Sequence, residues 1–272
     1  MEKELAGKIA IITGAGRMRS IGRPIARMLA RAGAAIVITG TGRRPEDSPD
    51  DEKAAGWRDI ESVAEEVSSE GVRCLPLVSD IRDERAVGEL VARTVREFGR
   101  IDIVINNASA ARGPDRVPVT ELSLDIWRKV YATNVEGTFL LSRAAARQMI
   151  AQGQGGSIVN VSSIASKIAA ASMAAYSSSK AAINALSRSL ALELAPHNIR
   201  VNALCPGIID TFRMDDLGRG EKWKTFVKTM IPLGYPGDGG ECAEIILFLV
   251  TDHGKWITGQ AINVDGGTVW GN

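Results

Sequence analysis

The sequence predicts an α/β fold in which a doubly wound parallel sheet carries helices on both faces. Short apolar runs rich in Ile and Val alternate with longer segments of helical period, as repeated β-α units do. The expected strands are mostly apolar, which is typical of strands that are covered on both faces. In addition, the first apolar run leads directly into a glycine-rich segment and then into a helical pattern.

About seven strands are expected, with helices between them. The strands are predicted over residues 9–13, 35–39, 73–78, 101–106, 157–161, 200–204 and 261–264. The helices are predicted over residues 24–32, 57–69, 84–98, 123–152, 173–195 and 240–251. Because crossovers between parallel strands are right-handed, these elements indicate a Rossmann-type sheet.

The whole chain, residues 1–272, is expected to form one domain, since folds of this class commonly reach this length with a single core. Two segments interrupt the β-α rhythm. Residues 43–56 contain two prolines and five acidic residues without apolar periodicity, and we expect a surface loop there. Residues 212–236 follow a strand end and mix aromatic with charged residues. This second segment is expected to form a flap over the substrate.

Composition favours a small-molecule partner. The 33 Lys and Arg residues balance 32 Asp and Glu, for a net charge of +1, so neither nucleic acid nor an anionic membrane is an expected partner. The three cysteines are scattered and lack metal-binding spacing, and we expect no metal. No apolar run has the length of a signal peptide or of a membrane span. We therefore expect a cytoplasmic protein.

The glycine-rich segment, residues 14–22, is the predicted phosphate loop. Its small residues let backbone N–H groups approach a pyrophosphate, and the helix that follows presents its positive end to the phosphates. We expect a dinucleotide to bind there. The residues expected to contact it are Gly14, Gly16, Arg19, Ser20, Ile21 and Gly22.

The end of the second strand indicates which dinucleotide binds. An acid at that position bonds the ribose hydroxyls of NAD(H) and repels the 2′-phosphate of NADP(H). Here the strand ends Thr39-Gly40-Thr41-Gly42 with no acid, and Arg43 and Arg44 follow. Arg17 and Arg19 lie in the neighbouring loop, and guanidinium groups hold a phosphate well. NADP(H) is therefore favoured, NAD(H) remains possible, and Thr41 and Arg43 are expected contacts.

Four residues form the candidate catalytic set. Tyr176 and Lys180 share one helix face at positions i and i+4, so the ammonium can favour ionisation of the phenol. A tyrosine needs this help to act as an acid or base near neutral pH. Ser163 follows a predicted strand, at the sheet edge where such folds bind ligands. Asn134 lies mid-helix, where Asn is a poor helix former.

With these residues, the chain resembles the short-chain dehydrogenase/reductase family from about residue 7 to residue 267. Asn134, Ser163, Tyr176 and Lys180 match the family's catalytic tetrad. The resemblance implies further cofactor contacts from Asp80, Ile81, Asn107, Ala108, Pro206, Gly207, Ile209 and Thr211, and from Tyr176 and Lys180 themselves. Val264-Asp265-Gly266-Gly267 matches the usual ending of the family.

Two features depart from the family pattern. The glycine loop is two residues longer than the common form, with Ser20 where the middle glycine would fall. This spacing resembles the enoyl-reductase branch, but that branch places six residues between Tyr and Lys, and only three stand here. Carbonyl and alcohol chemistry is therefore expected. In the turn after the fourth strand, Ser109 replaces a glycine.

The resemblance also implies the role of each residue. Tyr176 protonates the carbonyl oxygen as hydride arrives, and Ser163 hydrogen-bonds that oxygen. Lys180 lowers the pKa of the phenol and contacts the nicotinamide ribose. Asn134 holds a water that relays protons, and Thr211 bonds the carboxamide. The expected activity is hydride transfer between the nicotinamide and a secondary alcohol or ketone.

Substrate and assembly are less closely specified by the sequence. A 3-oxoacyl thioester, a small carbonyl compound or a polyol fits, and the basic residues of the flap could attract an acidic carrier or a phosphorylated group. The substrate wall is expected to include Ala110, Ala111, Ser166, Met173, Ile208, Phe212, Met214, Trp223 and Trp270. Two alternatives remain open, a dehydratase or epimerase of the same fold and a catalytically silent dinucleotide sensor or scaffold. The family usually forms tetramers through its long helices, so a homotetramer or dimer is expected.

Overall fold

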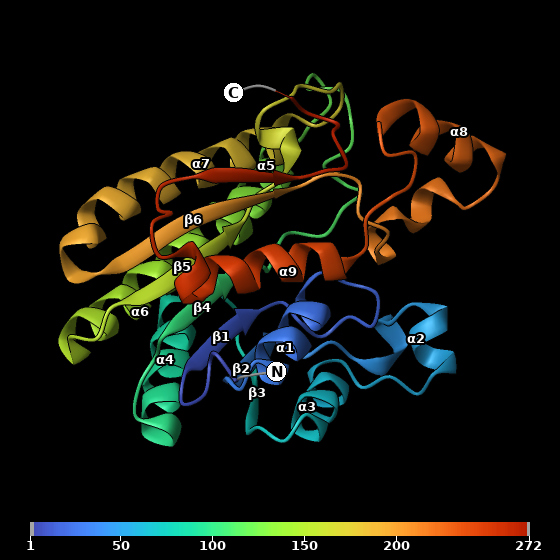
Figure 1. The fold of residues 1–272 in the computed structure, drawn as a ribbon. Helices are drawn as coiled ribbons and strands as arrows, with labels where there is room; N and C mark the ends of the chain where they lie inside the picture. The colour runs from blue at the N-terminus through green and yellow to red at the C-terminus, as the bar shows by residue number, and fades with distance from the viewer. Residues whose placement is uncertain (1–2, 271–272) are drawn as a thin grey trace.

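The computed structural model describes residues 3–270, which form a seven-stranded parallel sheet between two layers of helices (Figure 1). The strand order is β3-β2-β1-β4-β5-β6-β7. The order reverses between β1 and β4, which is the point where doubly wound sheets bind ligands. The predicted fold class is confirmed. The strands are β1 (Ile9–Thr13), β2 (Ala35–Gly40), β3 (Cys74–Val78), β4 (Ile103–Asn106), β5 (Gly156–Val161), β6 (Ile199–Pro206) and β7 (Ala261–Val264).

Two apolar clusters attach the helix layers to the sheet. Alternate residues of β1 belong to different clusters, Ala10 and Ile12 to one and Ile9 and Ile11 to the other, because side chains of a strand point to opposite faces. One layer contains α1 (Gly22–Arg31), α3 (Ile60–Ser69) and α9 (Gly239–Val250). The other contains α4 (Glu84–Phe98), α6 (Gly137–Gln152) and α7 (Ala174–Leu194).

The long helix predicted over residues 123–152 is interrupted. The structure has α5 (Leu124–Tyr131), a π-helical turn (Ala132–Glu136) and then α6. Asn134 lies in this turn, and its side chain bonds groups outside the helix. Single π turns inside helices often occur at functional sites because they redirect a side chain without ending the helix.

The expected surface loop over residues 43–56 was wrong in part. This segment contains a 3-10 turn (Pro45–Asp47) and the short helix α2 (Asp50–Ala54). Glu52 of α2 is buried and accepts hydrogen bonds from Arg17 at 2.9 Å and from the Met18 N–H at 2.8 Å. The segment folds because its acids pair with the glycine loop, an interaction between residues distant in sequence that apolar periodicity does not reveal.

The segment expected to form a flap stands apart from the main core. It holds a 3-10 turn (Phe212–Leu217) and α8 (Glu221–Met230), which lie at the end of the sheet near the last part of β6 (Figure 1). Trp223, Val227 and Ile231 form a small apolar cluster of their own. The flap is thus a separately packed unit beside the carboxyl ends of the strands.

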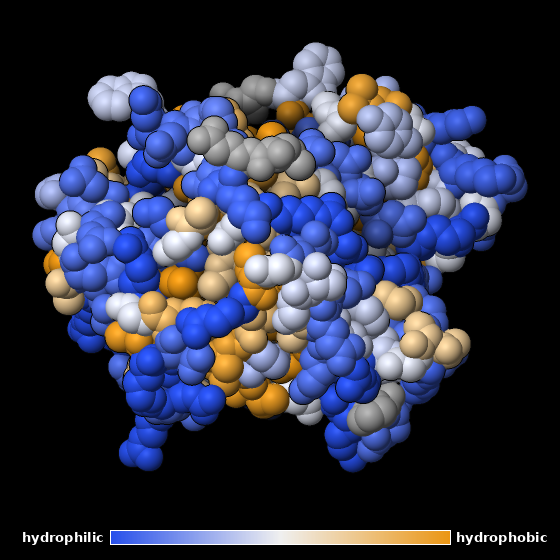
Figure 2. Space-filling model, turned by 60° about the horizontal axis from the view of Figure 1, so that its bottom comes forward, coloured by the Kyte–Doolittle hydropathy of each residue, from blue (hydrophilic) through white to orange (hydrophobic). Residues whose placement is uncertain are grey.

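The molecular surface is mostly polar on the face shown in Figure 2, where hydrophobic side chains lie in small groups among hydrophilic ones. Within residues 3–270, no helix combines the length and apolar character needed to cross a bilayer.

Asp102 links the amino ends of the central strands β1, β4 and β5 through hydrogen bonds. Its side chain is 4 % exposed and accepts hydrogen bonds from the Ile9 N–H at 3.0 Å and from Arg100 at 2.8 Å. Its backbone carbonyl accepts from the Ser157 N–H at the start of β5. One buried acid therefore joins the segments that begin β1, β4 and β5.

We predict that Asp102→Ala lowers the free energy of unfolding by about 2 kcal/mol, because it leaves the half-buried guanidinium of Arg100 and the backbone N–H of Ile9 without their acceptor. Urea unfolding measures the loss. Glu193→Ala on the exposed side of α7 is the control and should change the free energy by less than about 0.5 kcal/mol. Equal stability of the two variants would contradict this role of Asp102.

Candidate active site

A large cavity opens at the carboxyl ends of the strands. Its volume is about 1180 Å3, and it extends from the glycine loop past Tyr176 to the flap. Cavities that hold one drug-sized ligand measure about 300–1,000 Å3. The cavity therefore has room for a dinucleotide together with a small substrate.

Most of the predicted site residues line this cavity. Those that do are Gly14, Gly16, Ser20, Ile21, Thr41, Arg43, Asp80, Ile81, Asn107, Ala108, Ser163, Tyr176, Lys180, Pro206, Gly207, Ile209 and Thr211. Arg19, Gly22 and Asn134 are not among the lining residues. Of the expected substrate wall, Ser166 and Trp270 are also absent from the lining, and the Trp270 side chain is 88 % exposed.

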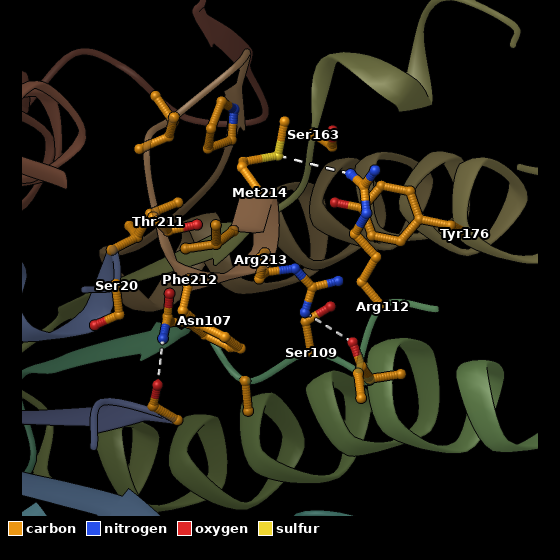
Figure 3. Close-up of a pocket in the computed structure, with 18 of the residues that line it drawn as sticks. Ser20, Asn107, Ser109, Arg112, Ser163, Tyr176, Thr211, Phe212, Arg213 and Met214 are labelled. Carbon is orange, nitrogen blue, oxygen red and sulfur yellow. Dashed lines mark hydrogen bonds between the residues drawn. The ribbon is translucent and has the colours of Figure 1, made fainter. Parts of the chain in front are cut away.

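The glycine loop packs too closely against its neighbours to admit a side chain at two positions. Gly14 has φ +65°, and a Cβ there would lie 2.7 Å from the Cα of Ala108. A Cβ on Gly16 would lie 1.5 Å from a carboxylate oxygen of Asp59. Asn107 closes the turn from the other side by donating to the carbonyls of Thr13 at 2.8 Å and Gly14 at 3.0 Å (Figure 3). Glycine is therefore required at both positions, and both line the cavity.

Tyr176, Lys180 and Ser163 meet at the middle of the cavity. Tyr176 and Lys180 lie on the first turns of α7, and the ammonium of Lys180 is 5.7 Å from the centre of the Tyr176 ring. The buried Lys180 donates to the carbonyl of Val161, at the end of β5, at 2.8 Å. Ser163 follows β5 directly, and its hydroxyl accepts from the Ala165 N–H at 3.1 Å. The strand end and the helix therefore bring the three side chains together.

The surroundings of Tyr176 favour its ionised form. Burial raises the pKa of the phenol, but the positive charges of Lys180, Arg213 and Arg116, together with the hydrogen bond to Ser163, lower that pKa below its ordinary value. Burial in turn lowers the pKa of Lys180, while the negative charge that Tyr176 acquires raises it. The phenol is thus adapted to exchange a proton nearer to neutral pH.

The side chain of Asn134 stabilises the wall of the cavity through hydrogen bonds. Its carbonyl oxygen accepts from the Ala110 N–H at 2.8 Å and from the Ser109 hydroxyl at 3.1 Å. Its amide donates to the Ser179 hydroxyl at 2.9 Å. Because these bonds join the turn after β4 to α7, the side chain positions both elements.

Asp59 is a residue that sequence reasoning missed. It stands just before α3, where its φ is +52°, and its side chain lies against Gly16 and Gly40 with 12 % exposure. Arg43 pairs with it at 3.5 Å. Burial raises the pKa of Asp59, and the charges of Arg43 and Arg17 oppose that rise. The end of β2 has no acid of its own, but Asp59, just before α3, places a carboxylate beside that strand end.

Three of the four arginines expected near the ribose are already engaged. Arg17 pairs with Glu52, and Arg19 pairs with Asp51 at 2.7 Å and with Asp215 of the flap. Arg44 is 71 % exposed and bonds Asp47. Arg17 and Arg43 both line the cavity, and within the described residues each has one buried nitrogen with no hydrogen-bond partner, Nε of Arg17 and Nη1 of Arg43. Arg43 is held least closely, at 3.5 Å from Asp59, and the ground for expecting NADP(H) therefore rests mainly on this arginine.

Three arginines lie beside Tyr176; sequence reasoning noted Arg213 as a basic residue of the flap but passed over Arg112 and Arg116. The Cζ atom of Arg116 lies 4.4 Å from the centre of the Tyr176 ring, and that of Arg213 lies 6.0 Å away. Arg112 reaches across between Met214 and the ring (Figure 3). No spacing rule marks these residues, because they come from the turn after β4 and from the flap.

Comparison with known proteins places the chain among oxidoreductases. A family model described as enoyl-(acyl carrier protein) reductase matches residues 14–269. The chain is 36 % identical over 268 residues to 3-oxoacyl-[acyl-carrier-protein] reductase of Aquifex aeolicus, covering 98 % of this chain and 99 % of the relative. It is 36 % identical over 264 residues to L-rhamnose 1-dehydrogenase (NAD(P)(+)) of Azotobacter vinelandii, covering 97 % of each.

The solved structure of a short-chain type dehydrogenase/reductase from Mycobacterium marinum is similar over almost its whole length. The two chains superpose with a TM-score of 0.82 at 31 % identity, covering 98 % of this chain and 97 % of the other. Sequence and fold thus agree on the group to which the chain is related.

We predict that Arg213→Gln moves the pH profile of alcohol oxidation upward. Oxidation needs the ionised phenol, so its rate rises as the pH passes the pKa of Tyr176, and removing a nearby positive charge raises that pKa. Initial rates measured across pH test this. Arg96→Gln, an exposed substitution on α4, should keep the wild-type profile. An unshifted profile for Arg213→Gln would exclude this influence of Arg213 on the phenol.

Proposed function

The chain belongs to the short-chain dehydrogenase/reductase family, an oxidoreductase family that acts on CH–OH or carbonyl groups, and we propose that it moves a hydride between a nicotinamide dinucleotide and a secondary alcohol or ketone. The observation that carries this proposal is the position of Tyr176, which lines the cavity at the carboxyl ends of the strands and whose pKa is lowered by Lys180 and Arg213. The side chain of Ser163 hydrogen-bonds Tyr176 in the same cavity.

The residues present fit a nicotinamide dinucleotide. The backbone at Gly14 and Gly16 bears no side chain and lines the cavity, which suits a pyrophosphate next to the amino end of α1. The guanidinium of Arg43 and the carboxylate of Asp59 suit the adenosine ribose. Thr211 also lines the cavity and would hold the carboxamide. When bound, the nicotinamide supplies or accepts the hydride.

The protein's own side chains then manage the proton and the charge. In reduction, Tyr176 donates its phenolic proton to the carbonyl oxygen, and the Ser163 hydroxyl hydrogen-bonds that oxygen as negative charge develops on it. In oxidation, the phenolate accepts the hydroxyl proton. Lys180 keeps the phenol near the form that each step needs. Asn134 fixes the turn after β4 against α7, which holds the cavity wall in place.

Arg43 and Asp59 govern the choice of dinucleotide in this proposal. The sequence favoured NADP(H), and Arg43 still supports a 2′-phosphate, but Asp59 beside it supports the free ribose hydroxyl of NAD(H). Arg43 and Asp59 form a pair. In that pair, Arg43 can turn to bind a 2′-phosphate, or Asp59 can turn to bind a ribose hydroxyl. We therefore propose that the site accepts both dinucleotides. The name of the Azotobacter vinelandii relative, which gives NAD(P)(+), agrees with this.

Assembly and location are parts of the same proposal. Exposed apolar side chains on α6 and α7, such as Phe139, Ile150 and Leu192, are suited to an interface between copies. We propose a homo-oligomer of cytoplasmic location. Sedimentation should give a mass that is a multiple of 29.0 kDa. A clean monomer would contradict the assembly.

We predict that Tyr176→Phe lowers turnover by at least about 10³-fold but leaves the affinity for NADH within about twofold, because only the proton donor is lost. NADH consumption over a panel of ketones gives the rate, and nicotinamide fluorescence gives the affinity. Tyr131→Phe, outside the cavity lining, should retain activity.

Two other outcomes of this experiment would be informative. Loss of NADH binding by Tyr176→Phe would make the tyrosine structural. Wild-type turnover of substrate with no stoichiometric change in nicotinamide absorbance would indicate an epimerase or dehydratase instead of net redox chemistry.

We predict opposite effects of two substitutions on dinucleotide choice. Asp59→Asn should strengthen NADPH binding about tenfold, because a carboxylate near the 2′-phosphate is removed, whereas Arg43→Gln should weaken it about tenfold. NADH affinity should change less in Arg43→Gln. The dissociation constants come from fluorescence titration, with the exposed Arg44→Gln as control. Equal effects on both dinucleotides would exclude a role of this pair in selectivity.

A further inference from the structure

We propose that the natural substrate carries a carboxylate near its reacting carbon, so that the site interconverts a hydroxy acid and an oxo acid. This inference rests on the proposed function, because it names the substrate class of the same site. It is carried by three arginines beside Tyr176, namely Arg112, Arg116 and Arg213. We refer to these three as the arginine cluster.

The arginine cluster lies at the substrate end of the cavity. All three side chains belong to the cavity lining. Arg116 packs over the Tyr176 ring at 4.4 Å, and Arg213 lies 6.0 Å from the same centre. Figure 3 shows Arg112 between Met214 and Tyr176, with Arg213 close by. A carbonyl bonded to the phenol would therefore have guanidinium groups within a few ångströms.

Arg116 lacks the partners that a buried guanidinium needs. Its side chain is 17 % exposed, and its Nε and Nη1 are buried with no hydrogen-bond partner in the described part of the chain. The neighbouring acid, Asp115, is 3.7 Å from Nε, which is too far for a hydrogen bond. Unpaired buried donors are costly, and in native proteins they indicate a missing partner. A ligand with acceptor oxygens would complete this site.

The charges of the arginine cluster do not balance. Arg112 pairs with Asp216 at 3.0 Å, and Arg116 faces Asp115. Arg213 bonds only the Ala110 carbonyl, at 2.8 Å, and has no carboxylate within 4.0 Å among residues 3–270. Three positive charges therefore face two negative ones, which leaves one positive charge. A carboxylate on the ligand would compensate this excess.

The chemistry of guanidinium groups favours the same ligand. The planar fork of an arginine matches the two oxygens of a carboxylate, and such bonds orient the ligand as well as hold it. Held in this way, the substrate presents its carbonyl to Tyr176 and Ser163. Hydride adds to the carbonyl carbon, Tyr176 gives its proton to the oxygen, and the carboxylate remains unchanged. The reverse steps oxidise the hydroxy acid.

The arginine cluster could instead act only on the phenol. In that case it would assist every ketone alike, whether or not the ketone bears a charge. An acid and its methyl ester share the reacting carbon and differ in the charge, so the two compounds separate these possibilities.

The test compares 2-, 3- and 4-oxo acids with their methyl esters, each with NADH and NADPH, at the pH plateau of each variant. We expect wild type to show kcat/KM at least about tenfold higher for the best acid than for its ester. Arg116→Gln and Arg213→Gln should each lower kcat/KM for the acid about tenfold or more, mainly through KM. The kcat/KM for the ester should change little in these two variants. The exposed Arg96→Gln should change kcat/KM for neither compound.

A binding measurement keeps this inference separate from the redox proposal. The tryptophan fluorescence of the protein, to which the cavity residue Trp223 contributes, is titrated with acid or ester in the presence of NAD+, which cannot reduce a ketone. Saturable binding of an acid, lost in Arg116→Gln, supports the carboxylate site even if no compound is turned over. Equal binding and turnover of acids and esters would overturn it. So would variants that weaken both compounds to the same extent.

Discussion

The buried contact between Lys180 and Tyr176 is the interaction on which the site depends. A phenol alone ionises far above neutral pH, and burial makes ionisation harder still. Lys180 reverses this effect, and it can do so only because its ammonium is fixed to the Val161 carbonyl at the end of β5. The end of β5 therefore fixes the position of the positive charge next to the phenol, and the spacing along α7 fixes the distance between the Lys180 and Tyr176 side chains.

Charge pairing organises the rest of the cavity in a similar way. Arg19 bonds Asp51 of α2 and Asp215 of the flap, so the glycine loop, the inserted helix and the flap are joined by one side chain. The backbone N–H of Phe212 also donates to the Arg19 carbonyl at 3.1 Å. These contacts fix the position of the glycine loop relative to residues 212–236. Near the ribose and near the substrate, by contrast, the arginines retain donors without partners.

The sequence predicted what depends on local pattern and missed what depends on distant pairing. Apolar runs located the strands, and β1 has the expected bounds, because strand residues are apolar wherever both faces are covered. Tyr176 and Lys180 could be found since four residues bring two side chains to one helix face. Asp59 and Arg116 could not, because each reaches the cavity through turns whose course depends on tertiary contacts. Asn134 was singled out correctly as an unusual helix residue, but its bonds required coordinates.

Direct titration of the phenol is the measurement that tests the central claim most directly. The chain has three tyrosines, so the difference in ultraviolet absorbance between wild type and Tyr176→Phe across pH isolates the ionisation of Tyr176. The charges around it predict a phenolate that appears at lower pH than an ordinary tyrosine, whose pKa is about 10. A Tyr176 that ionises at or above that ordinary value would contradict the role assigned to Lys180 and to the arginines beside the ring.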